Sequence, residues 1–293
     1  MGESIEFVEE YANKPHRTVF TYNETGIPGL ALIGRHHSYI ARDPVVCHFH
    51  RNCIEMTFMV QGNLVFLANE KHYSINGGDV FITPADMPHD TGSHPMGICE
   101  MYWVQLRLDD PSFLFLGKDW ASNLRKSLQN LEIGIIRGVG FSRKYLSEMF
   151  SLITCGSAND TYQGISRLVH ILHGIIGSVS KPPDSPSEDI QRAVDFIHAN
   201  SHESINLQAL ADVAGLSLPR FKQKFHQQTG MSPRLFINTQ KVEHARELLT
   251  QGKTITEVAF DLGFNSSSYF SSVFYKFTRL SPSEFIRKHA GDT

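Results

Sequence analysis

The sequence predicts an α+β multidomain protein: an antiparallel β-barrel with flanking helices, then an all-α domain with two helix-turn-helix units joined by one helix. Three observations support this prediction. Short alternating apolar runs recur through residues 30–108, a segment rich in proline and serine spans residues 178–188, and a duplicated helical pattern follows that segment.

Strands are expected in the first part of the chain. Apolar and polar residues alternate in residues 56–60, 64–67, 80–82 and 100–108. Turn-forming residues separate these runs at 61–63, 76–79 and 86–88. A spacing of about ten residues between short strands is typical of a β-sandwich or barrel.

The hydrophobic period changes to that of helices in residues 119–130, 142–154 and 161–178. The last segment has an apolar stripe made of Ile165, Leu168, Val169, Leu172, Ile175 and Ile176. Such a stripe either packs on its own domain or pairs two subunits. We expect residues 1–178 to form the first domain, with both roles open for the helices of 119–178.

Three prolines and four serines mark residues 178–188 as a boundary. Proline fixes φ and removes a hydrogen-bond donor, so we expect residues 179–188 to form an exposed linker. Residues 189–293 then make up the second domain.

Composition excludes several classes of protein. Hydrophobic residues make up 41% and charged residues 19% of the 293 residues, which is ordinary for a globular chain and unlike a disordered or rod-like one. No apolar stretch reaches the roughly 18 residues of a membrane-spanning helix. The acidic, polar N-terminus is unlike a secretory signal. Four scattered cysteines are expected to be reduced thiols, so we expect a cytoplasmic protein.

An internal repeat follows the linker. Residues 207–217 match residues 255–265, and Gly215 aligns with Gly263. Farther on, the aligned residues are Phe221 and Phe270, Phe225 and Phe274, and Ser232-Pro233 and Ser281-Pro282. In each copy we expect the glycine to end a first helix in the left-handed conformation. The second helix is expected to be capped by Ser217 in one copy and by Asn265 or Ser266 in the other.

Two copies of this pattern favour DNA-binding helix-turn-helix units over ordinary helix packing. The joining helix, residues 233–249, would be about 25 Å long at about 1.5 Å per residue. It can hold two recognition helices roughly one turn of DNA apart, about 34 Å. The net charge of the chain is −3. Residues 218–246 nevertheless hold six basic side chains against the single acidic Glu243, which is compatible with binding to nucleic acid.

Residues 190–290 resemble the DNA-binding domain of AraC-type transcription regulators. The matching stretches are residues 210–217, 225–233 and 255–264, Tyr269-Phe270 with Phe274, and residues 281–285. The resemblance implies sequence-specific binding to promoter DNA under the control of an effector-sensing domain. It also implies RNA polymerase as a partner if the protein is an activator.

By this resemblance the base-facing positions are Pro219, Lys222 and Gln223 in the first recognition helix and Ser268, Ser271 and Ser272 in the second. Arg220 is also expected to point outward. Lysine can donate to guanine, and glutamine can pair with adenine. Candidates for phosphate contacts are Lys224, Lys276 and Arg279. The alternative for each lysine is a solvated surface charge.

Three positions depart from the family pattern. The family often has arginine at the positions of Gln223 and Ser272 and usually glycine at the position of Arg279. A second recognition helix that offers only serine predicts weak base discrimination, so this half is expected mainly to hold phosphates. Arg279 leaves the conformation of the local turn open.

A cluster of metal-ligand residue types lies in the first domain. His48 and His50 alternate on an expected strand and would share one face, while Cys47 would point away into the core. Glu55 and His89 complete a set of three nitrogens and one oxygen. Such a set suits zinc, iron, manganese or nickel.

The pattern His-x-His-x4-Glu-x6-Gly, followed by Gly-x5-Pro-x4-His, resembles the two cupin motifs, with Asp86 in place of the usual glycine of the second motif. In AraC-type regulators the first domain is commonly a cupin-like barrel that binds a sugar or another small molecule without metal. Three interpretations of His48, His50, Glu55 and His89 stay open: effector pocket, metal site, or histidines satisfied within the barrel. Trp103 and Tyr102 alternate, and Trp103 would stack on a sugar if it faces the pocket.

We therefore expect a homodimeric DNA-binding transcription regulator controlled by a small molecule, for which the resemblance implies a sugar. The alternative is a metal-dependent cupin enzyme or a metal-responsive regulator that uses the same four residues. No nucleophile motif, phosphate loop or dinucleotide motif accompanies the histidines, so we expect no enzymatic activity.

Overall fold

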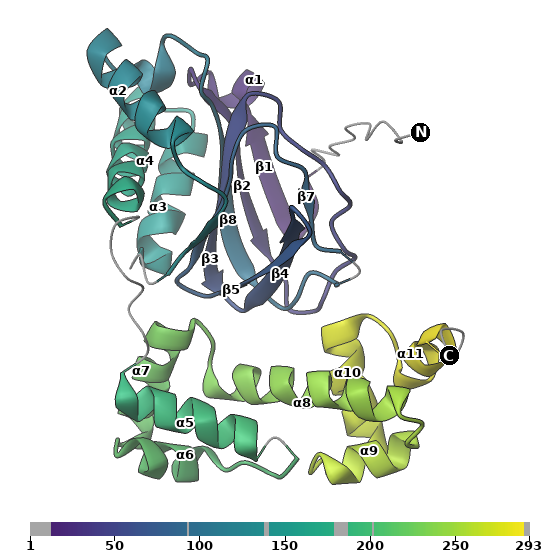
Figure 1. Ribbon diagram of the computed structural model, residues 1–293. Helices are drawn as coiled ribbons and strands as arrows, with labels where there is room; N and C mark the ends of the chain where they lie inside the picture. Colours follow the sequence, from purple (N-terminus) through teal and green to yellow (C-terminus); the bar gives the residue numbers. More distant parts are fainter. Residues whose placement is uncertain (1–12, 93, 138–140, 179–186, 201, 290–293) are drawn as a thin grey trace. The chain divides into compact units, whose positions relative to one another are not determined.

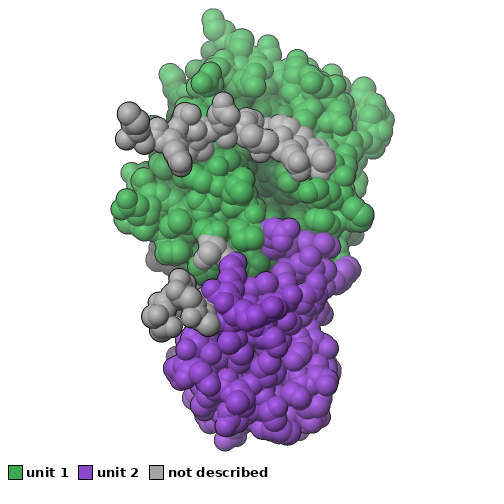
Figure 2. All heavy atoms as spheres, turned by 90° about the vertical axis from the view of Figure 1, so that its right-hand side faces the viewer, with its two compact units in different colours: residues 1–38, 44–184 green, residues 39–43, 185–293 purple. Residues whose placement is uncertain are grey.

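The computed structural model describes residues 13–92, 94–137, 141–178, 187–200 and 202–289. The chain divides into two compact units, residues 1–38 with 44–184 and residues 39–43 with 185–293 (Figure 2). Most of the expected linker, residues 179–186, lies outside the described residues. Within the described ranges, no helix has both the length and the apolar character that are needed to cross a bilayer.

The first unit contains two antiparallel sheets (Figure 1). The larger has the strand order β1-β2-β8-β3-β6-β9 and the smaller the order β5-β4-β7. The strands are β1 Arg17–Thr21, β2 Leu30–His37, β3 Cys53–Gln61, β4 Asn63–Ala68, β5 Lys71–Asn76, β6 Val80–Thr83, β7 His89–Asp90, β8 Glu100–Arg107 and β9 Gly134–Ile136. Side chains from both sheets, among them Leu32, Phe66 and Phe81, form a common apolar interior. This confirms the predicted antiparallel β domain.

Helices cover the other face of the larger sheet, where α2 Lys118–Gln129, α3 Arg143–Thr154 and α4 Ala158–Ser178 lie together (Figure 1). Two shorter helices, α1 Tyr22–Thr25 and η1 Phe113–Phe115, complete the unit. Successive side chains of a strand point to opposite faces, so Trp103 joins the interior between the sheets while Tyr102 packs under the helices.

The apolar stripe of α4 packs on its own unit. Leu168 and Leu172 are fully buried in the core beneath the helices, and Val169 and Ile176 pack against that core. Of the two interpretations of this stripe, the structure therefore shows the internal one. The outward side of α4 is mostly polar and includes Tyr162 as an exposed aromatic residue.

The second unit is helical, with its longest helix between two smaller groups (Figure 1). The first group is α5 Glu188–Ala199, α6 Leu207–Ala214 and α7 Leu218–Thr229. The long helix is α8 Pro233–Thr250, and the second group is α9 Ile255–Asp261, α10 Ser267–Thr278 and α11 Pro282–His289. Each group has its own apolar core, one around Phe221 and Phe225 and one around Phe270 and Phe274. The duplicated helix-turn-helix architecture is confirmed.

Turn chemistry explains the ends of these helices. Gly215 and Gly263 adopt left-handed φ values of 68° and 66°, as expected from the repeat. Ser266 caps α10 by accepting a hydrogen bond from the amide of Tyr269 at 3.1 Å. Ser217 precedes α7 as its N-terminal cap residue, without a side-chain hydrogen bond to the helix.

Arg279 ends α10 in the left-handed conformation, with φ 64°. The turn is therefore kept although arginine stands where the resemblance implies glycine. Asp86 shows the same behaviour in the first unit, with φ 61° at the position of the cupin glycine. The Asp86 carboxylate accepts a hydrogen bond from the Asn52 amide at 3.1 Å, and aspartate tolerates this backbone region better than most residues.

Candidate functional sites

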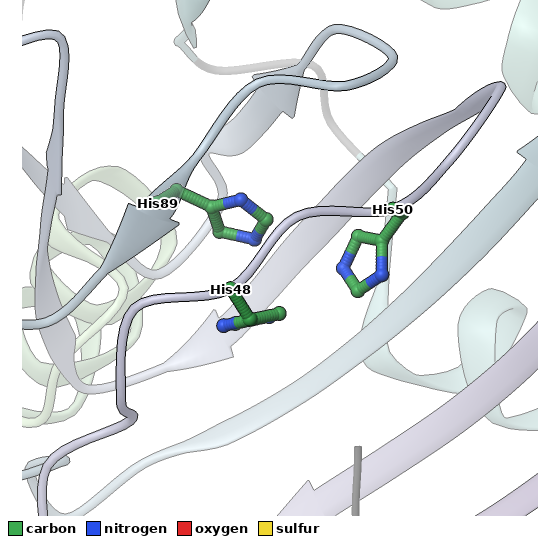
Figure 3. Close-up of side chains that lie close together, drawn as sticks. All are labelled: His48, His50 and His89. Carbon is green, nitrogen blue, oxygen red and sulfur yellow. The ribbon is translucent and has the colours of Figure 1, made fainter. Parts of the chain in front are cut away.

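The first candidate site is a group of three histidine rings in the first unit (Figure 3). The ring centroids of His48 and His89 lie 4.4 Å apart, those of His48 and His50 5.0 Å, and those of His50 and His89 5.3 Å. The His48 amide donates to the His89 carbonyl at 3.1 Å, and the His89 amide donates to the His48 carbonyl at 2.9 Å. The structure thus brings together the three histidines predicted from the sequence.

The segment that holds His48 and His50 corrects two expectations. It precedes β3 and makes an isolated bridge between His48 and His89 instead of the expected strand. Cys47 is exposed instead of buried in the core. Within the described ranges the only bridge of this segment is that to His89, and Val46 and Cys47 are exposed.

Glu55 reaches the histidines from β3. Its Oε2 lies 3.0 Å from Nε2 of His50, and its Oε1 lies 3.6 Å from Nε2 of His89. Gln105, directly opposite on β8, donates to Oε2 of Glu55 at 3.0 Å and lies 3.1 Å from Nε2 of His50. We name His48, His50, Glu55, His89 and Gln105 the histidine cluster.

The sequence did not indicate Gln105, because only the register of β3 against β8 places it beside Glu55. Two further hydroxyl groups beside Glu55 were also missed: alternation along β3 places Thr57 on the same face, and the register of β6 against β3 places Thr83 opposite. Thr57 donates to Oε1 of Glu55 at 3.4 Å. Thr83, opposite Glu55 on β6, has a buried hydroxyl that makes no hydrogen bond within the described part of the chain.

Backbone acceptors orient two of the rings. Nδ1 of His48 lies 2.8 Å from the carbonyl oxygen of Val46, and Nδ1 of His89 lies 3.0 Å from that of Met87. A carbonyl oxygen only accepts, so the hydrogen bonds assign the proton of each neutral ring to Nδ1 and the lone pair to Nε2. This arrangement is common around metal-binding histidines.

Burial and charge set the protonation of the histidine cluster. Burial, with a contribution from neighbouring His89, lowers the pKa of His48 to about 4, so its ring is neutral at pH 7. Burial opposes the charge of Glu55, but hydrogen bonds with His50 and His89 outweigh it and hold the pKa of Glu55 well below its usual value. Burial also opposes the charge of His89, yet Glu55 raises the pKa of that ring.

The residues of the histidine cluster fit two kinds of ligand. Donor atoms of the three histidines all lie within 4.8 Å of one another, and Glu55 adds oxygen donors, a set that suits a divalent transition metal. The same carboxylate, amide and imidazole groups can also bind the hydroxyls of an organic molecule. His50, Glu55 and His89 are only 4%, 7% and 1% exposed, whereas His48 is half-buried and borders solvent.

Trp103 faces the interior of the sheets, as the effector-binding interpretation requires. Its ring packs directly over Gly34 on β2. The guanidinium of Arg17 lies 5.4 Å from the ring centroid and contacts one ring face. Stacking of a sugar on that face would therefore require Arg17 to move.

The second candidate site is the outward surface of α7. Phe221 and Phe225 are fully buried, and this fixes which side of the helix faces out. Pro219, Arg220, Lys222 and Gln223 are among the exposed side chains of α7, as expected. They come from one helix, so they can enter one groove of DNA together.

Lys224 differs from these residues. Its Nζ lies 2.6 Å from Oδ2 of Asp189 on α5, and both side chains are partly buried. We predicted a phosphate contact for Lys224, but the carboxylate within its own unit already neutralises its charge. We therefore leave Lys224 out of the interface proposed below.

The serines of α10 have limited hydrogen-bonding capacity. Ser268 and Ser272 are exposed and Ser271 is half-buried. The Ser271 hydroxyl donates to the Ser267 carbonyl at 2.8 Å, and the Ser272 hydroxyl donates to the Ser268 carbonyl at 3.0 Å. Phosphate oxygens only accept, so while these bonds persist Ser271 and Ser272 can accept from a base but cannot donate to a phosphate.

Two basic residues are the remaining phosphate candidates on this side. Lys276 is exposed on α10. Arg279 is half-buried, and its Nη1 lies 3.3 Å from the hydroxyl of Tyr275. The expectation that α10 mainly holds phosphates therefore depends on Lys276 and Arg279 and not on the serines.

Comparison with protein families defines the class of the chain. Residues 45–112 match the model of the AraC-like ligand binding domain, and residues 210–288 match that of a helix-turn-helix domain. The protein is a DNA-binding transcription regulator with a ligand-binding domain, and not an enzyme. It belongs to the AraC family of transcription regulators, as its sequence resemblance indicated.

Individual relatives extend over different parts of the chain. The HTH-type transcriptional activator RhaR of Escherichia coli O1:K1 is 27% identical over 248 residues, which are 81% of this chain and 86% of that protein. An uncharacterized HTH-type transcriptional regulator of Staphylococcus aureus strain MSSA476 is 28% identical over 123 residues, 41% of this chain and 16% of that protein. The crystal structure of ToxT from Vibrio cholerae O395 aligns with 95% of this chain and 100% of its own, at 13% identity and a TM-score of 0.35.

Proposed function

We propose that this regulator binds promoter DNA through the outward residues of α7 and α10, and that a small hydroxylated metabolite such as a sugar controls this binding from the histidine cluster. One observation carries the proposal. The residues of the histidine cluster all fall within the stretch that matches the ligand-binding domain, and they concentrate polar groups in an apolar interior. Burial of polar groups is costly unless they are satisfied, so such a concentration is typical of a binding site.

In the proposed complex with DNA, α7 supplies most of the base recognition and α10 supplies less. Lys222 can donate to guanine and Gln223 can pair with adenine in the major groove. Ser268, Ser271 and Ser272 offer less discrimination, and Lys276 and Arg279 hold the backbone. Because promoter DNA is the target, the protein acts in the cytoplasm, and RNA polymerase is its partner if it activates, as RhaR does by name.

The proposed dimer does not use the apolar stripe of α4, which is buried. Exposed aromatic side chains lie instead on the outward side of α4 and near that helix. Phe115 and Tyr162 have ring centroids 6.1 Å apart, and Trp120 is exposed on α2. We propose that this surface pairs two copies of the chain. Analytical ultracentrifugation of the wild type and of Tyr162→Ser tests it, and a wild type that stays monomeric at high concentration contradicts it.

The experiment for the effector combines two steps. Selection from randomised duplex DNA gives a binding site, and a panel of sugars is then screened for a rise in melting temperature, which a ligand of the native state produces. We expect the active compound to alter DNA affinity in the wild type and in Glu132→Gln, a control at an exposed position. Glu55→Gln should lose the response, and a response that survives in Glu55→Gln contradicts the site.

A metal-responsive regulator is the second candidate, and the backbone hydrogen bonds at Nδ1 of His48 and His89 favour it. They occupy Nδ1 of each ring and leave the Nε2 atoms, one of which lies beside Glu55, as the positions that can coordinate a metal ion. Metal analysis of protein purified without a nickel column tests this candidate. One equivalent per chain, lost in the double variant His48→Ala/His50→Ala, supports a metal site. Sub-stoichiometric metal in a folded wild type supports the organic effector alone.

A further inference from the structure

A groove separates the two helix-turn-helix units within the second unit of the chain. Its volume is about 580 Å³. The start of α6 and part of α7 form one side, α8 contributes its first half, and the turn before α10 forms the other side. The two recognition helices, α7 and α10, border the groove through Lys222 and Tyr269.

The groove is positively charged. Lys222 of α7 and Arg234 and Lys241 of α8 line it, and none of its lining residues is acidic. Asn206 and Asn238 add polar groups. Lys222 and Arg234 are exposed, and no carboxylate among the described residues forms an ion pair with either. Uncompensated cations on concave surfaces attract anions.

Lys241 stabilises one wall of the groove. It is 6% exposed, its Nζ donates to the carbonyl of Leu262, and it lies 5.2 Å from the ring centroid of Phe264. These contacts tie α8 to the turn that precedes α10. Burial lowers the pKa of Lys241, and a nearby anion would offset the cost of burying its charge.

The position of the groove suits a strand of DNA. When α7 and α10 enter successive major grooves, the backbone that borders the intervening minor groove must pass between the two helix-turn-helix units. The groove is lined by Lys222 on α7 and by Tyr269, which is exposed at the start of α10. It therefore lies between the outward surfaces of α7 and α10, which we call the two reading surfaces. A phosphodiester chain has the charge that complements this lining.

We propose that this groove binds the sugar–phosphate backbone of the DNA between the two reading surfaces, with Arg234 as its main phosphate contact. Arg234 lies in the first turn of α8, and its guanidinium can form two parallel hydrogen bonds to one phosphate. The proposal rests on the DNA binding proposed above and adds a contact that is independent of base sequence.

The test uses the full chain and a mixed-sequence DNA duplex of about 25 base pairs, a little over two helical turns. Affinity is measured over a series of salt concentrations for the wild type and Arg234→Gln. We expect Arg234→Gln to weaken binding about tenfold and to reduce the slope of log affinity against log salt by about 0.9, which is the loss of one phosphate contact. Arg234→Lys should keep most of the slope, because it keeps the charge.

Two controls make the outcome specific. Lys288→Gln removes one exposed positive charge from α11, outside the groove, and should change neither affinity nor slope. Gln223→Ala should weaken binding to a selected site more than binding to the mixed sequence, whereas Arg234→Gln should weaken both alike. Thermal melting of each variant verifies that the second unit is folded.

The results separate this proposal from the proposed function. If Arg234→Gln binds the mixed-sequence duplex with the affinity and salt slope of the wild type, the groove does not bind the backbone, although the regulator still binds DNA. Weakening that is confined to the selected site would make Arg234 a base-reading residue and would also overturn the proposal. If the wild type binds neither duplex, the proposed function itself fails.

Discussion

Arg279 ends α10 in the same left-handed conformation in which Gly230 ends α7. The φ and ψ angles are 64° and 6° for Arg279 and 66° and 5° for Gly230. The two turns occupy equivalent places in the repeat, so the backbone geometry is kept while the residue that favours it is lost in the second copy. A residue with a Cβ atom in this region costs about 1–2 kcal/mol.

We predict that Arg279→Gly stabilises the second unit. The substitution also removes the contact of the guanidinium with Tyr275, whose ring centroid lies 5.5 Å away. Such a cation–π contact contributes about 0.5–1 kcal/mol at an exposed site, which is less than the strain that is relieved. We expect a net gain of about 0.5–1 kcal/mol, or roughly 2–8 °C in melting temperature. The melting temperature is measured from the loss of the helical far-UV circular dichroism signal.

The reciprocal change at Gly230 is the control. Gly230→Ala should lower the melting temperature, because it places a Cβ atom in the left-handed conformation in the first copy of the repeat. Arg279→Gly should also weaken DNA binding if Arg279 contacts a phosphate. An unchanged or lower melting temperature for Arg279→Gly would show that the turn of α10 is not strained.

The ion pair between Asp189 and Lys224 predicts a pH dependence. The hydrogen bond from Lys224, with help from Ser187, lowers the pKa of Asp189 to about 2 from its usual 3.8. Since the folded-state pKa is the lower one, the pair stabilises the fold above about pH 4, and this stabilisation is lost as the pH falls towards 2. Asp189→Asn should therefore be less stable than the wild type at pH 7, and the difference should shrink over that range.

Urea unfolding of the second unit at several pH values measures this difference. Lys224→Met should give a similar pH profile, and the double variant should cost little more than either single one, because both changes break the same pair. A stability difference between the wild type and Asp189→Asn that stays constant from pH 5 to about pH 2 would contradict the role of the ion pair.

The close packing of Gly34 and Trp103 predicts a size limit in the first unit. A Cβ atom at Gly34 would lie 2.2 Å from the Trp103 ring, so the ring would have to move. We expect Gly34→Ala to destabilise the first unit by about 1–3 kcal/mol. Tryptophan fluorescence in urea measures this, because Trp103 and Trp120, the two tryptophans of the chain, both belong to the first unit.

Gly134→Ala is the matched control for this substitution. Gly134 also lies in a strand of the larger sheet, but a Cβ atom there meets no other atom within 4 Å. It should leave the urea midpoint nearly unchanged. Equal midpoints for Gly34→Ala and Gly134→Ala would mean that Trp103 adjusts at no cost.

Periodicity predicted much of the fold and of the DNA-facing site. The four-residue spacing of Phe221 and Phe225 defines a buried face of α7, and Lys222 and Gln223 necessarily point away from it. The repeat likewise predicted the glycines that end the first helix of each unit. These are local properties, because a helix or strand determines on its own which side chains share a face.

Other outcomes depended on elements distant in the sequence. Gln105 joins Glu55 through the register of β8 on β3, and Lys224 meets Asp189 because α7 packs on α5. The histidine cluster itself forms although its first two members lie outside a regular strand.

The sequence by itself determined the class of the protein, its two-part architecture and the outward side of its recognition helices, since these follow from short-range patterns. Only the tertiary structure decided which outward charges stay free, which polar groups surround Glu55, and that a basic groove lies beside Arg234. Each of these depends on the partner that packing places opposite a side chain, and a residue's own neighbours in the chain do not reveal that partner.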